Sequence, residues 1–250
     1  MQERMLKRHI TEIKIMLVNI DAKYLDWLAA VYLSQDEVGI KEIWDGMDLH
    51  TDNQHAFKLP SRLIAKVFLF RIIFGGTAWS FARDPDFKTV GFSIREWEEA
   101  IDRFYGKYVG IKRWHDGLIK QATTTRFISI PTGRRWRFEP RVSEGDVKWP
   151  VTTIKNYPVQ GLEADLMMIA RISLFNRIKH EAEILLVNSV HDSIVVDCPL
   201  HHVDFVVGTM KSVFNDVPAN FKKLFGVEFN LPFRGEIQIG TDWKNMEEVA

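Results

Sequence analysis

The stretch from Leu185 to Pro199, LLVNSVHDSIVVDCP, constrains the fold most strongly. Two apolar runs rich in β-branched residues flank the triplet His191-Asp192-Ser193, a pattern typical of two short strands joined by a tight turn. A buried carboxylate is costly unless a cation or a hydrogen-bond donor meets it, so Asp192 requires a metal ion or a basic partner. An ordinary hairpin with a polar turn also fits this stretch.

A second apolar run, IMLVNI, is followed by Asp21 and then by Tyr24, Leu25, Leu28 and Val31 at helical spacing. If the two runs are neighbouring strands of one sheet, Asp21 and Asp192 converge. Two carboxylates at such a distance favour a divalent cation between them. Oxygen ligands without a cluster of His or Cys indicate Mg²⁺ rather than Zn²⁺. The pattern therefore outlines a two-metal site for phosphoryl transfer.

Composition limits the surroundings of such a site. Acidic and basic residues number 33 each, so the net charge is zero, and any surface that binds nucleic acid must be a local basic patch. The only cysteine, Cys198, excludes an internal disulfide framework and suits a reducing cytosol. The sequence has neither a signal-peptide core nor an apolar run of about 20 residues that would cross a membrane. We therefore expect a cytoplasmic protein without a membrane partner.

Residues 60–76, PSRLIAKVFLFRIIFGG, have the punctuation of a helix, with Pro-Ser at the start and two glycines at the end. Arg62, Lys66, Phe70 and Phe74 follow one another at steps of four residues and form one stripe on that helix. Two cations suit a triphosphate, and two rings offer a stacking face for a base. Core rings with solvated cations are the alternative interpretation.

The other predicted elements surround these. We expect helices over 35–46, 48–57, 94–121, 157–178 and 201–225, the second with Asp48 as N-cap, an extended pair around 131–133, and a closing strand within 229–243. The densest basic cluster, Arg134, Arg135, Arg137 and Arg141, could hold a phosphate backbone or could be a solvated hairpin.

Six segments resemble, in the right order, signatures of the polymerase module of family A DNA polymerases, the bacterial DNA polymerase I group and its phage relatives. NIDAKYLDWLAAVYLSQD is similar to their motif A, SRLIAKVFLFRIIFGG to motif B, and VHDS to motif C. The shorter segments GMDLHT, GRRWRF and NYPVQGLEAD are similar to the DIHT, GRRRYLP and N-x-P-x-Q-G-x-x-A-D segments. The resemblance covers nearly the whole chain.

The resemblance implies an α+β fold of the right-hand polymerase type, with an antiparallel palm sheet and a helical fingers insertion. Residues 1–34 would be palm with motif A, 35–140 fingers with motif B, and 141–250 palm with motif C. Family members normally place a thumb, and often a 3′–5′ exonuclease domain, before motif A, whereas only 20 residues precede Asp21 here. We therefore expect a split polymerase, in which this chain has neither domain and a separate protein carries the thumb and exonuclease. A phage genome could encode such a pair, and both proteins would then act in the cytoplasm of the host.

The resemblance also implies roles for individual residues. Asp21, Asp192 and the backbone carbonyl of Ala22 would ligate two Mg²⁺ ions, for which Mn²⁺ could substitute, and Lys66 would donate a proton to the leaving pyrophosphate. The residues implied to bind the incoming nucleotide are Arg62, Lys66, Phe70, Phe74, His50, Asp26 and Tyr24. The residues implied to bind DNA are Asn156, Gln160, His191, Arg134 and Arg135.

Three departures from the family pattern bear on these roles. Asp26 stands where the family has the steric-gate Glu that excludes a 2′-hydroxyl, which predicts looser sugar discrimination. Ser193 stands where motif C usually has an acid, so the sequence predicts no third carboxylate there. Arg71 replaces a common Gly in motif B.

The predicted function is template-directed DNA synthesis, with 5′–3′ nucleotidyl transfer from a dNTP to the 3′-hydroxyl of a primer, on a primer-template. A single-subunit RNA polymerase shares the palm and is one alternative. A degenerate palm that serves replication without catalysis is another. A metal phosphohydrolase of the HD type is disfavoured, since its His-Asp pair needs a helix with further His ligands, whereas β-branched runs surround His191-Asp192.

Overall fold

The computed structural model describes residues 14–143 and 146–249, which form two compact units. The first, here called the sheet unit, contains the described residues up to Lys23, Leu166–Asn220 and the described residues from Phe233 onward. The second, the helical unit, contains Tyr24–Asp165 and Phe221–Pro232. The predicted palm and fingers boundaries at residues 34/35 and 140/141 stay predictions.

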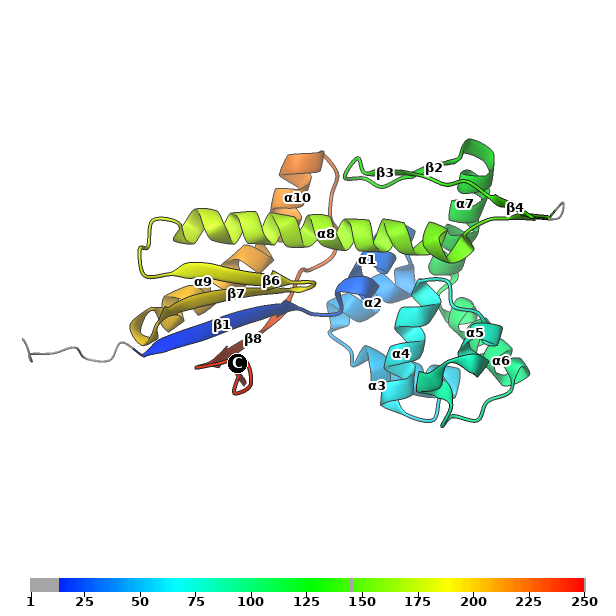
Figure 1. Ribbon diagram of the computed structural model, residues 1–250, viewed down its shortest axis with the longest axis horizontal. Coiled ribbons are helices and arrows are strands. Elements are labelled where there is room, and N and C mark those ends of the chain that lie inside the picture. The colour runs from blue at the N-terminus through cyan, green and yellow to red at the C-terminus, as the bar shows by residue number, and fades with distance from the viewer. Residues whose placement is uncertain (1–13, 144–145, 250) are drawn as a thin grey trace, which may run out of the picture. The chain divides into compact units, whose positions relative to one another are not determined.

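The sheet unit contains one antiparallel sheet with the strand order β6-β7-β1-β8-β9 (Figure 1). The strands are β1 (Ile15–Ala22), β6 (Leu185–Val190), β7 (Ser193–Pro199), β8 (Gly235–Gly240) and β9 (Glu247–Val249). β1 and β7 are largely buried, as their continuous apolar runs require, whereas the edge strand β6 is mostly exposed. The predicted hairpin, closing strand and α+β class are confirmed.

Helix α9 (Val203–Asn215) contacts β1, β7 and β8 and buries Val206, Met210 and Val213. The prediction of one helix over 201–225 was wrong. The chain forms a short 3₁₀ segment, η2 (Leu200–His202), then α9, and then a separate helix α10 (Val217–Phe225). The break follows from Pro218, which has no amide hydrogen to continue the bonding of α9 but is well suited to the first turn of a new helix.

The helical unit begins with α1 (Leu25–Ser34), α2 (Glu37–Asp45), α3 (Leu49–Phe57), α4 (Arg62–Ile73) and α5 (Ala78–Arg83), followed by η1 (Pro85–Phe87), α6 (Ile94–Lys107) and α7 (Val109–Thr125). Two short hairpins, β2 (Phe127–Ser129) with β3 (Arg135–Arg137) and β4 (Arg141–Ser143) with β5 (Asp146–Lys148), precede α8 (Val151–Ile178). The core of the helical unit is aromatic, with Phe57, Phe68, Trp97 and Phe104 fully buried against one another.

The prediction of one helix over 94–121 was also wrong, because α6 and α7 are separated at Tyr108. The Tyr108 hydroxyl lies 2.8 Å from a carboxylate oxygen of Glu42 and 2.7 Å from Oδ1 of Asn53. The carboxylate of Asp36 accepts hydrogen bonds from the amides of Gly110 (2.6 Å) and Ile111 (3.3 Å) and so caps α7. Hydrogen bonds to residues of α2, of α3 and of the loop before α2 therefore stabilise the separation of α6 from α7.

Helix α8 starts six residues earlier than the predicted range 157–178 and contains Pro158. Residues Val151–Asp165 of α8 belong to the helical unit, and the remainder belongs to the sheet unit. No helix within residues 14–143 and 146–249 is long and apolar enough to cross a membrane.

Candidate active site

Asp21 and Asp192 lie at the same end of neighbouring strands in the sheet unit. Asp21 in β1 is directly opposite Ser193, the first residue of β7. The amide of Ala22 donates a 2.8 Å hydrogen bond to the carbonyl oxygen of Asp192. His191 and Asp192 form the turn, with His191 in the left-handed region at φ 50°. The structure therefore brings together the four predicted residues of this unit, Asp21, Ala22, His191 and Asp192.

Ser193 closes the hairpin. Its hydroxyl donates a 3.0 Å hydrogen bond to the carbonyl oxygen of Val190, and the residue is 8% exposed. The proton of Ser193 is thus used inside the turn that presents Asp192.

A third carboxylate, that of Glu236, lies on β8 and was not among the site residues predicted from the sequence. Glu236 is directly opposite Asp21, and directly opposite residues of an antiparallel pair project from the same face of the sheet. Its carboxylate forms a 2.8 Å ion pair with Lys23. The alternation of Glu236 and Gln238 with Ile237 and Ile239 marks the polar face of β8, which is the pattern that would have identified it.

These groups fit Mg²⁺. The carboxylates of Asp21 and Asp192 and the carbonyl of Ala22 are oxygen donors, which hard divalent cations prefer. Two protein carboxylates suffice, since Mg²⁺ commonly keeps several waters and completes its shell with substrate phosphate oxygens.

Helix α4 of the helical unit carries the predicted nucleotide-binding stripe. Ser61 caps its start by accepting a 3.2 Å hydrogen bond from the amide of Ile64. Lys66 is exposed, with Nζ 6.0 Å from the centre of the half-buried Phe70 ring. Phe74, also half-buried, is the C-cap residue, just before Gly75 at φ 87°. The predicted stripe is therefore partly open to solvent instead of lying wholly in the core.

Arg62 is paired with Asp48, a residue that the sequence identified only as a helix cap. Arg62 Nε and Nη2 each lie 3.1 Å from one oxygen of the Asp48 carboxylate. The fork of hydrogen bonds holds the pKa of Asp48 well below its usual range. Asp48 also caps α3 as predicted, by accepting from the amides of His50 and Thr51. A triphosphate would have to share Arg62 with this carboxylate.

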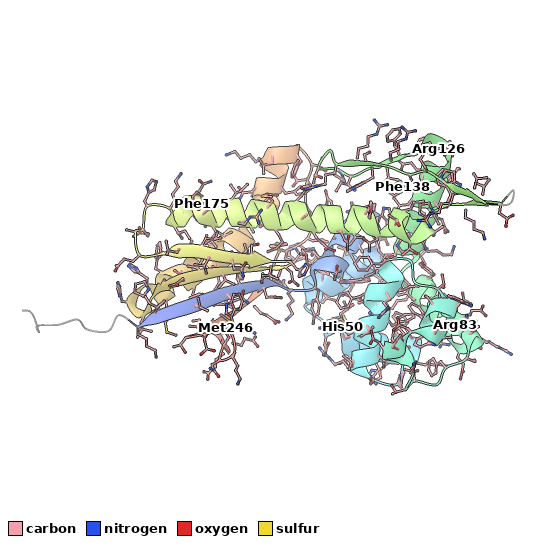
Figure 2. All side chains as sticks on the ribbon, in the orientation of Figure 1. His50, Arg83, Arg126, Phe138, Phe175 and Met246 are labelled. Atoms are coloured by element: carbon pink, nitrogen blue, oxygen red, sulfur yellow. The ribbon has the colours of Figure 1, made fainter. Side chains whose placement is uncertain are left out.

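His50 is a buried residue among the predicted nucleotide-binding residues. The residue, labelled in Figure 2, is 2% exposed, and its ring lies edge-on to those of Tyr24 and Phe70, with centroids 5.2 and 6.0 Å away. Among the residues with described positions, neither ring nitrogen has a hydrogen-bond partner. Burial, aided by the charges of Arg62 and Lys66, lowers the pKa of His50 to about 4. At neutral pH, His50 is an uncharged donor and acceptor whose buried nitrogens favour a polar ligand.

Tyr24 and Asp26 lie at the start of α1. Tyr24 is the N-cap residue and adopts a left-handed conformation at φ 53°, which is uncommon for an aromatic residue and costs free energy. Asp26 is half-buried in the first turn, where the helix dipole favours an acid.

Apart from His191, the predicted DNA-binding residues lie on α8 and on the β2–β3 hairpin. Asn156 and Gln160 are four residues apart on α8 and so share a face, with Gln160 exposed. Nε and Nη2 of Arg134 each lie 2.8 Å from Oδ1 of Asp165, and Nε lies 2.9 Å from Oδ2. These hydrogen bonds raise the pKa of Arg134. The Arg135 guanidinium lies 3.7 Å from the centre of the Phe127 ring. The charge of Arg134 is therefore partly compensated within the chain.

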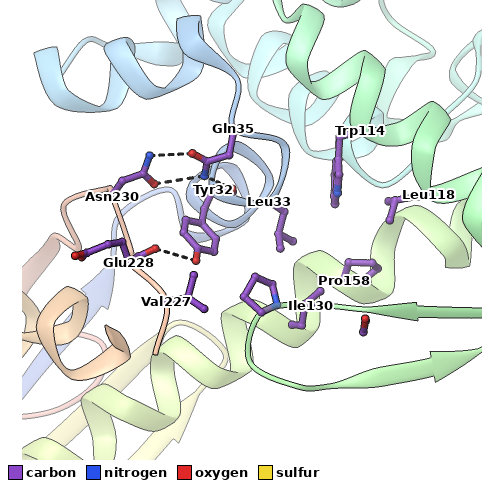
Figure 3. Close-up of a pocket in the computed structure, with 12 residues that line it drawn as sticks. Tyr32, Leu33, Gln35, Trp114, Leu118, Ile130, Pro158, Val227, Glu228 and Asn230 are labelled. Atoms are coloured by element: carbon purple, nitrogen blue, oxygen red, sulfur yellow. Dashed lines mark hydrogen bonds between the residues drawn. The ribbon is translucent and has the colours of Figure 1, made fainter. Parts of the chain in front are cut away.

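The helical unit also contains a pocket of about 450 Å³, and Figure 3 shows the side chains that line it. Tyr32, Trp114, Ile130 and Pro158 are among its lining side chains. The Tyr32 hydroxyl donates a 3.0 Å hydrogen bond to the carbonyl of Glu228 at its rim. None of the predicted site residues lines this pocket.

Comparisons with known proteins agree with the signatures. The family model for DNA polymerase family A matches residues 2–245. The thermostable DNA polymerase I of Thermus aquaticus is 24% identical over 262 residues, covering 98% of this chain and 29% of that protein. DNA polymerase I of Lactococcus lactis subsp. cremoris is 22% identical over 241 residues, covering 91% and 26%. The chain thus spans less than a third of the length of these relatives.

A solved structure shares the fold. The POL domain of Pol1 from M. smegmatis, in complex with DNA primer-template and dNTP, matches with a TM-score of 0.76 at 18% identity, covering 91% of this chain and 40% of that chain. The fold is therefore that of a polymerase domain of this kind, as the sequence signatures predicted. Since the family model matches nearly the whole chain, the protein belongs to DNA polymerase family A.

Proposed function

We propose that this chain catalyses template-directed DNA synthesis, adding nucleotides in the 5′–3′ direction to a primer. The observation that carries the proposal is the pairing of β1 with β7, which brings Asp21 and Asp192 to one end of the sheet. Membership of DNA polymerase family A supports the same activity. The M. smegmatis structure contains a primer-template and a dNTP, and these are the substrates we propose here.

In this reaction the 3′-hydroxyl oxygen of the primer forms a bond to the α-phosphorus of the dNTP, and the bond from that phosphorus to the bridging oxygen breaks. Two Mg²⁺ ions, when bound, would lower the pKa of the hydroxyl and offset charge on the leaving pyrophosphate. Asp21, Asp192 and the Ala22 carbonyl would hold them. Mn²⁺, which also accepts oxygen ligands, is the proposed substitute.

The residues of the helical unit would hold the nucleotide. Arg62 presents a planar fork suited to phosphate oxygens, and exposed Lys66 offers a point charge and a proton for the leaving pyrophosphate. The unpartnered nitrogens of His50 would bond a phosphate oxygen. Phe70 and Phe74 would contact the sugar and base, and Tyr24 and Asp26 would lie at the sugar.

The DNA would be held by contacts of two kinds. Asn156, Gln160 and His191 would contact primer and template, where minor-groove acceptors occur at every base pair and report pair geometry. Arg134 and Arg135 would contact backbone phosphates. Because phosphate contacts supply much of DNA affinity and the net charge is zero, we expect weak binding by this chain alone. Two expectations stay predictions. One is that a separate protein carries the thumb and the 3′–5′ exonuclease, and the other is that the chain acts in the cytoplasm of a phage host.

Primer extension tests the activity. The purified chain should extend a labelled primer with Mg²⁺ and dNTPs, and Asp192→Asn should abolish extension while leaving the circular dichroism spectrum unchanged. Asp197→Asn, which changes another half-buried aspartate on β7, is the matched control and should retain activity. Extension by the Asp192→Asn variant would refute the assignment. If the parent chain extends no primer, with or without a candidate partner, the result would favour a non-catalytic palm. If the parent chain prefers rNTPs to dNTPs, the result would favour an RNA polymerase.

A further inference from the structure

Three potential metal ligands meet at the other end of the β6–β7 hairpin. Glu183 lies in the turn between α8 and β6, and His201 and His202 lie in η2, directly after β7. Glu183 Oε2 is 3.7 Å from Nε2 of His201 and 3.6 Å from Nε2 of His202. One ligand atom from each residue can be chosen so that all three lie within 4.8 Å of one another. Within the described residues this is the one such trio found.

The spacing fits a tetrahedral ion. Ligands about 2.0–2.1 Å from Zn²⁺, at tetrahedral angles, are about 3.4 Å apart. The two distances from Glu183 exceed this by only a few tenths of an ångström. The rings of His201 and His202 lie beside each other, with centroids 4.3 Å apart. Small rotations of the three side chains would complete the geometry, and the fourth position would be left for water.

The donors also select the metal. Two imidazole nitrogens and one carboxylate suit Zn²⁺ and its neighbours Co²⁺, Ni²⁺ and Cu²⁺, whereas Mg²⁺ prefers oxygen donors. The side chains of Glu183 and His201 are 54% and 64% exposed, and that of His202 is 27% exposed. Little desolvation would therefore oppose binding, and an ion could reach the site.

The backbone around the three residues is anchored. Ile184, next to Glu183, and Val203, next to His202, are buried. The amide of Leu200, next to His201, donates a 3.0 Å hydrogen bond to the carbonyl of Lys14. The ligands thus project from fixed backbone, which reduces the entropy lost when an ion orders them.

We propose that Glu183, His201 and His202 bind one transition-metal ion of the Zn²⁺ class, which clamps the open end of the β6–β7 hairpin. Glu183 is two residues before β6, and His201 is two residues after β7. The seven residues of β7 separate this site from Asp192 by roughly 20 Å, so it is distinct from the proposed Mg²⁺ site. An ion that binds only the folded chain stabilises it in proportion to its concentration over Kd.

Zn²⁺ titration calorimetry in excess Mg²⁺, on the full chain after removal of any affinity tag, tests the site. We expect one Zn²⁺ per chain, and at least 10-fold weaker binding in Glu183→Gln and in the double variant His201→Ala/His202→Ala. His180→Ala, which removes a nearby exposed histidine outside the trio, is the matched control and should bind like the parent. Co²⁺ absorption should show a tetrahedral d–d spectrum in the parent and lose it in the double variant.

Thermal unfolding supplies a second readout. Zn²⁺ should raise the Tm of the parent and of His180→Ala but not that of the double variant, while all three have similar Tm values in EDTA. A double variant that binds Zn²⁺ as tightly as the parent, or a parent that binds none, would overturn the proposal. Primer extension in Mg²⁺ should be equal in parent and double variant, so failure of this proposal is distinguishable from failure of the polymerase assignment.

Discussion

The amide of Ala22 donates a hydrogen bond to the carbonyl oxygen of Asp192, which ties the end of β1 to the turn of the β6–β7 hairpin. The bond joins residues far apart in the chain and holds the backbone next to Asp21 against the backbone of the second aspartate. The relative position of the two carboxylates therefore depends on the hairpin turn as much as on the strands.

Ser193→Ala should destabilise the protein without abolishing its activity. The change removes the hydrogen bond to the Val190 carbonyl, which corresponds to a loss of about 1 kcal/mol in the free energy of unfolding. Urea denaturation measures this loss. If Ser193→Ala loses primer extension at unchanged stability, then Ser193 acts on the substrate or metal and its role in the turn is secondary.

Asp26→Glu should restrict the choice of sugar. Asp26 is one methylene shorter than the family's usual Glu and lies in the first turn of α1, so the parent should incorporate ribonucleotides more readily than the variant. Single-nucleotide incorporation with rNTP and dNTP gives the ratio for each protein. Equal ratios for parent and variant would refute the looser steric gate.

Arg62→Ala and Asp48→Asn should act differently on nucleotide binding. Loss of the guanidinium removes charge-assisted hydrogen bonds and should raise KM for dNTP about 10-fold or more. Asp48→Asn keeps a good N-cap for α3 but frees Arg62 from its carboxylate, so KM should stay equal or fall. Steady-state kinetics measure both values, and a higher KM in Asp48→Asn would show that the Arg62–Asp48 pair itself orders the site.

Acid should destabilise the chain through two buried histidines. Burial lowers the pKa of His50 to about 4, and burial with the nearby Lys155 charge lowers that of His115 to about 3, whereas unfolded His titrates near 6.5. The unfolded chain thus takes up protons first, so stability is complete above pH 6.5 and falls as the pH drops towards 4. For His50 alone the loss is about 3 kcal/mol.

Urea denaturation between pH 7 and 4 checks this dependence. The double variant His50→Gln/His115→Gln should show a flatter profile than the parent. His55→Gln, which changes an exposed histidine of α3, is the control and should leave the slope unchanged. A parental slope in the double variant would mean that other groups govern the acid sensitivity.

Lys107→Met should strongly destabilise the helical unit. Lys107 Nζ lies 2.8 Å from Glu42 and 2.5 Å from Asp52, and the Glu42 side chain is only 8% exposed. Removing the cation leaves a buried charge, at a cost of about 3–5 kcal/mol. Thermal or urea unfolding measures it, with Lys112→Met as an exposed control that should cost less than about 1 kcal/mol. Adding Glu42→Gln to Lys107→Met should recover part of the loss.

The elements whose signals are local could be predicted from the order of residues alone. The β-branched runs fixed β1 and the β6–β7 hairpin, and Ser61, Asp48 and Gly75 marked helix ends. Pro218 carried a local signal for the break between α9 and α10, which the predicted long helix ignored. The ordered signatures identified the family because they are patterns of residue type that need no coordinates.

The relationships between residues that are distant in the chain became visible only in the folded protein. The break at Tyr108 depends on Glu42 and Asn53. Arg62 is paired with Asp48. The register of β1 against β8 places Glu236 on the same face of the sheet as Asp21. The apolar spacing of 94–121 is continuous across the break. Gly106 and Gly110 flank Tyr108 and weaken the helix locally, but the interruption itself also depends on the buried hydroxyl and on the cap from Asp36. Hydrogen bonds and ion pairs between separate elements form only once packing has brought them together, and this is why a one-dimensional pattern does not contain them.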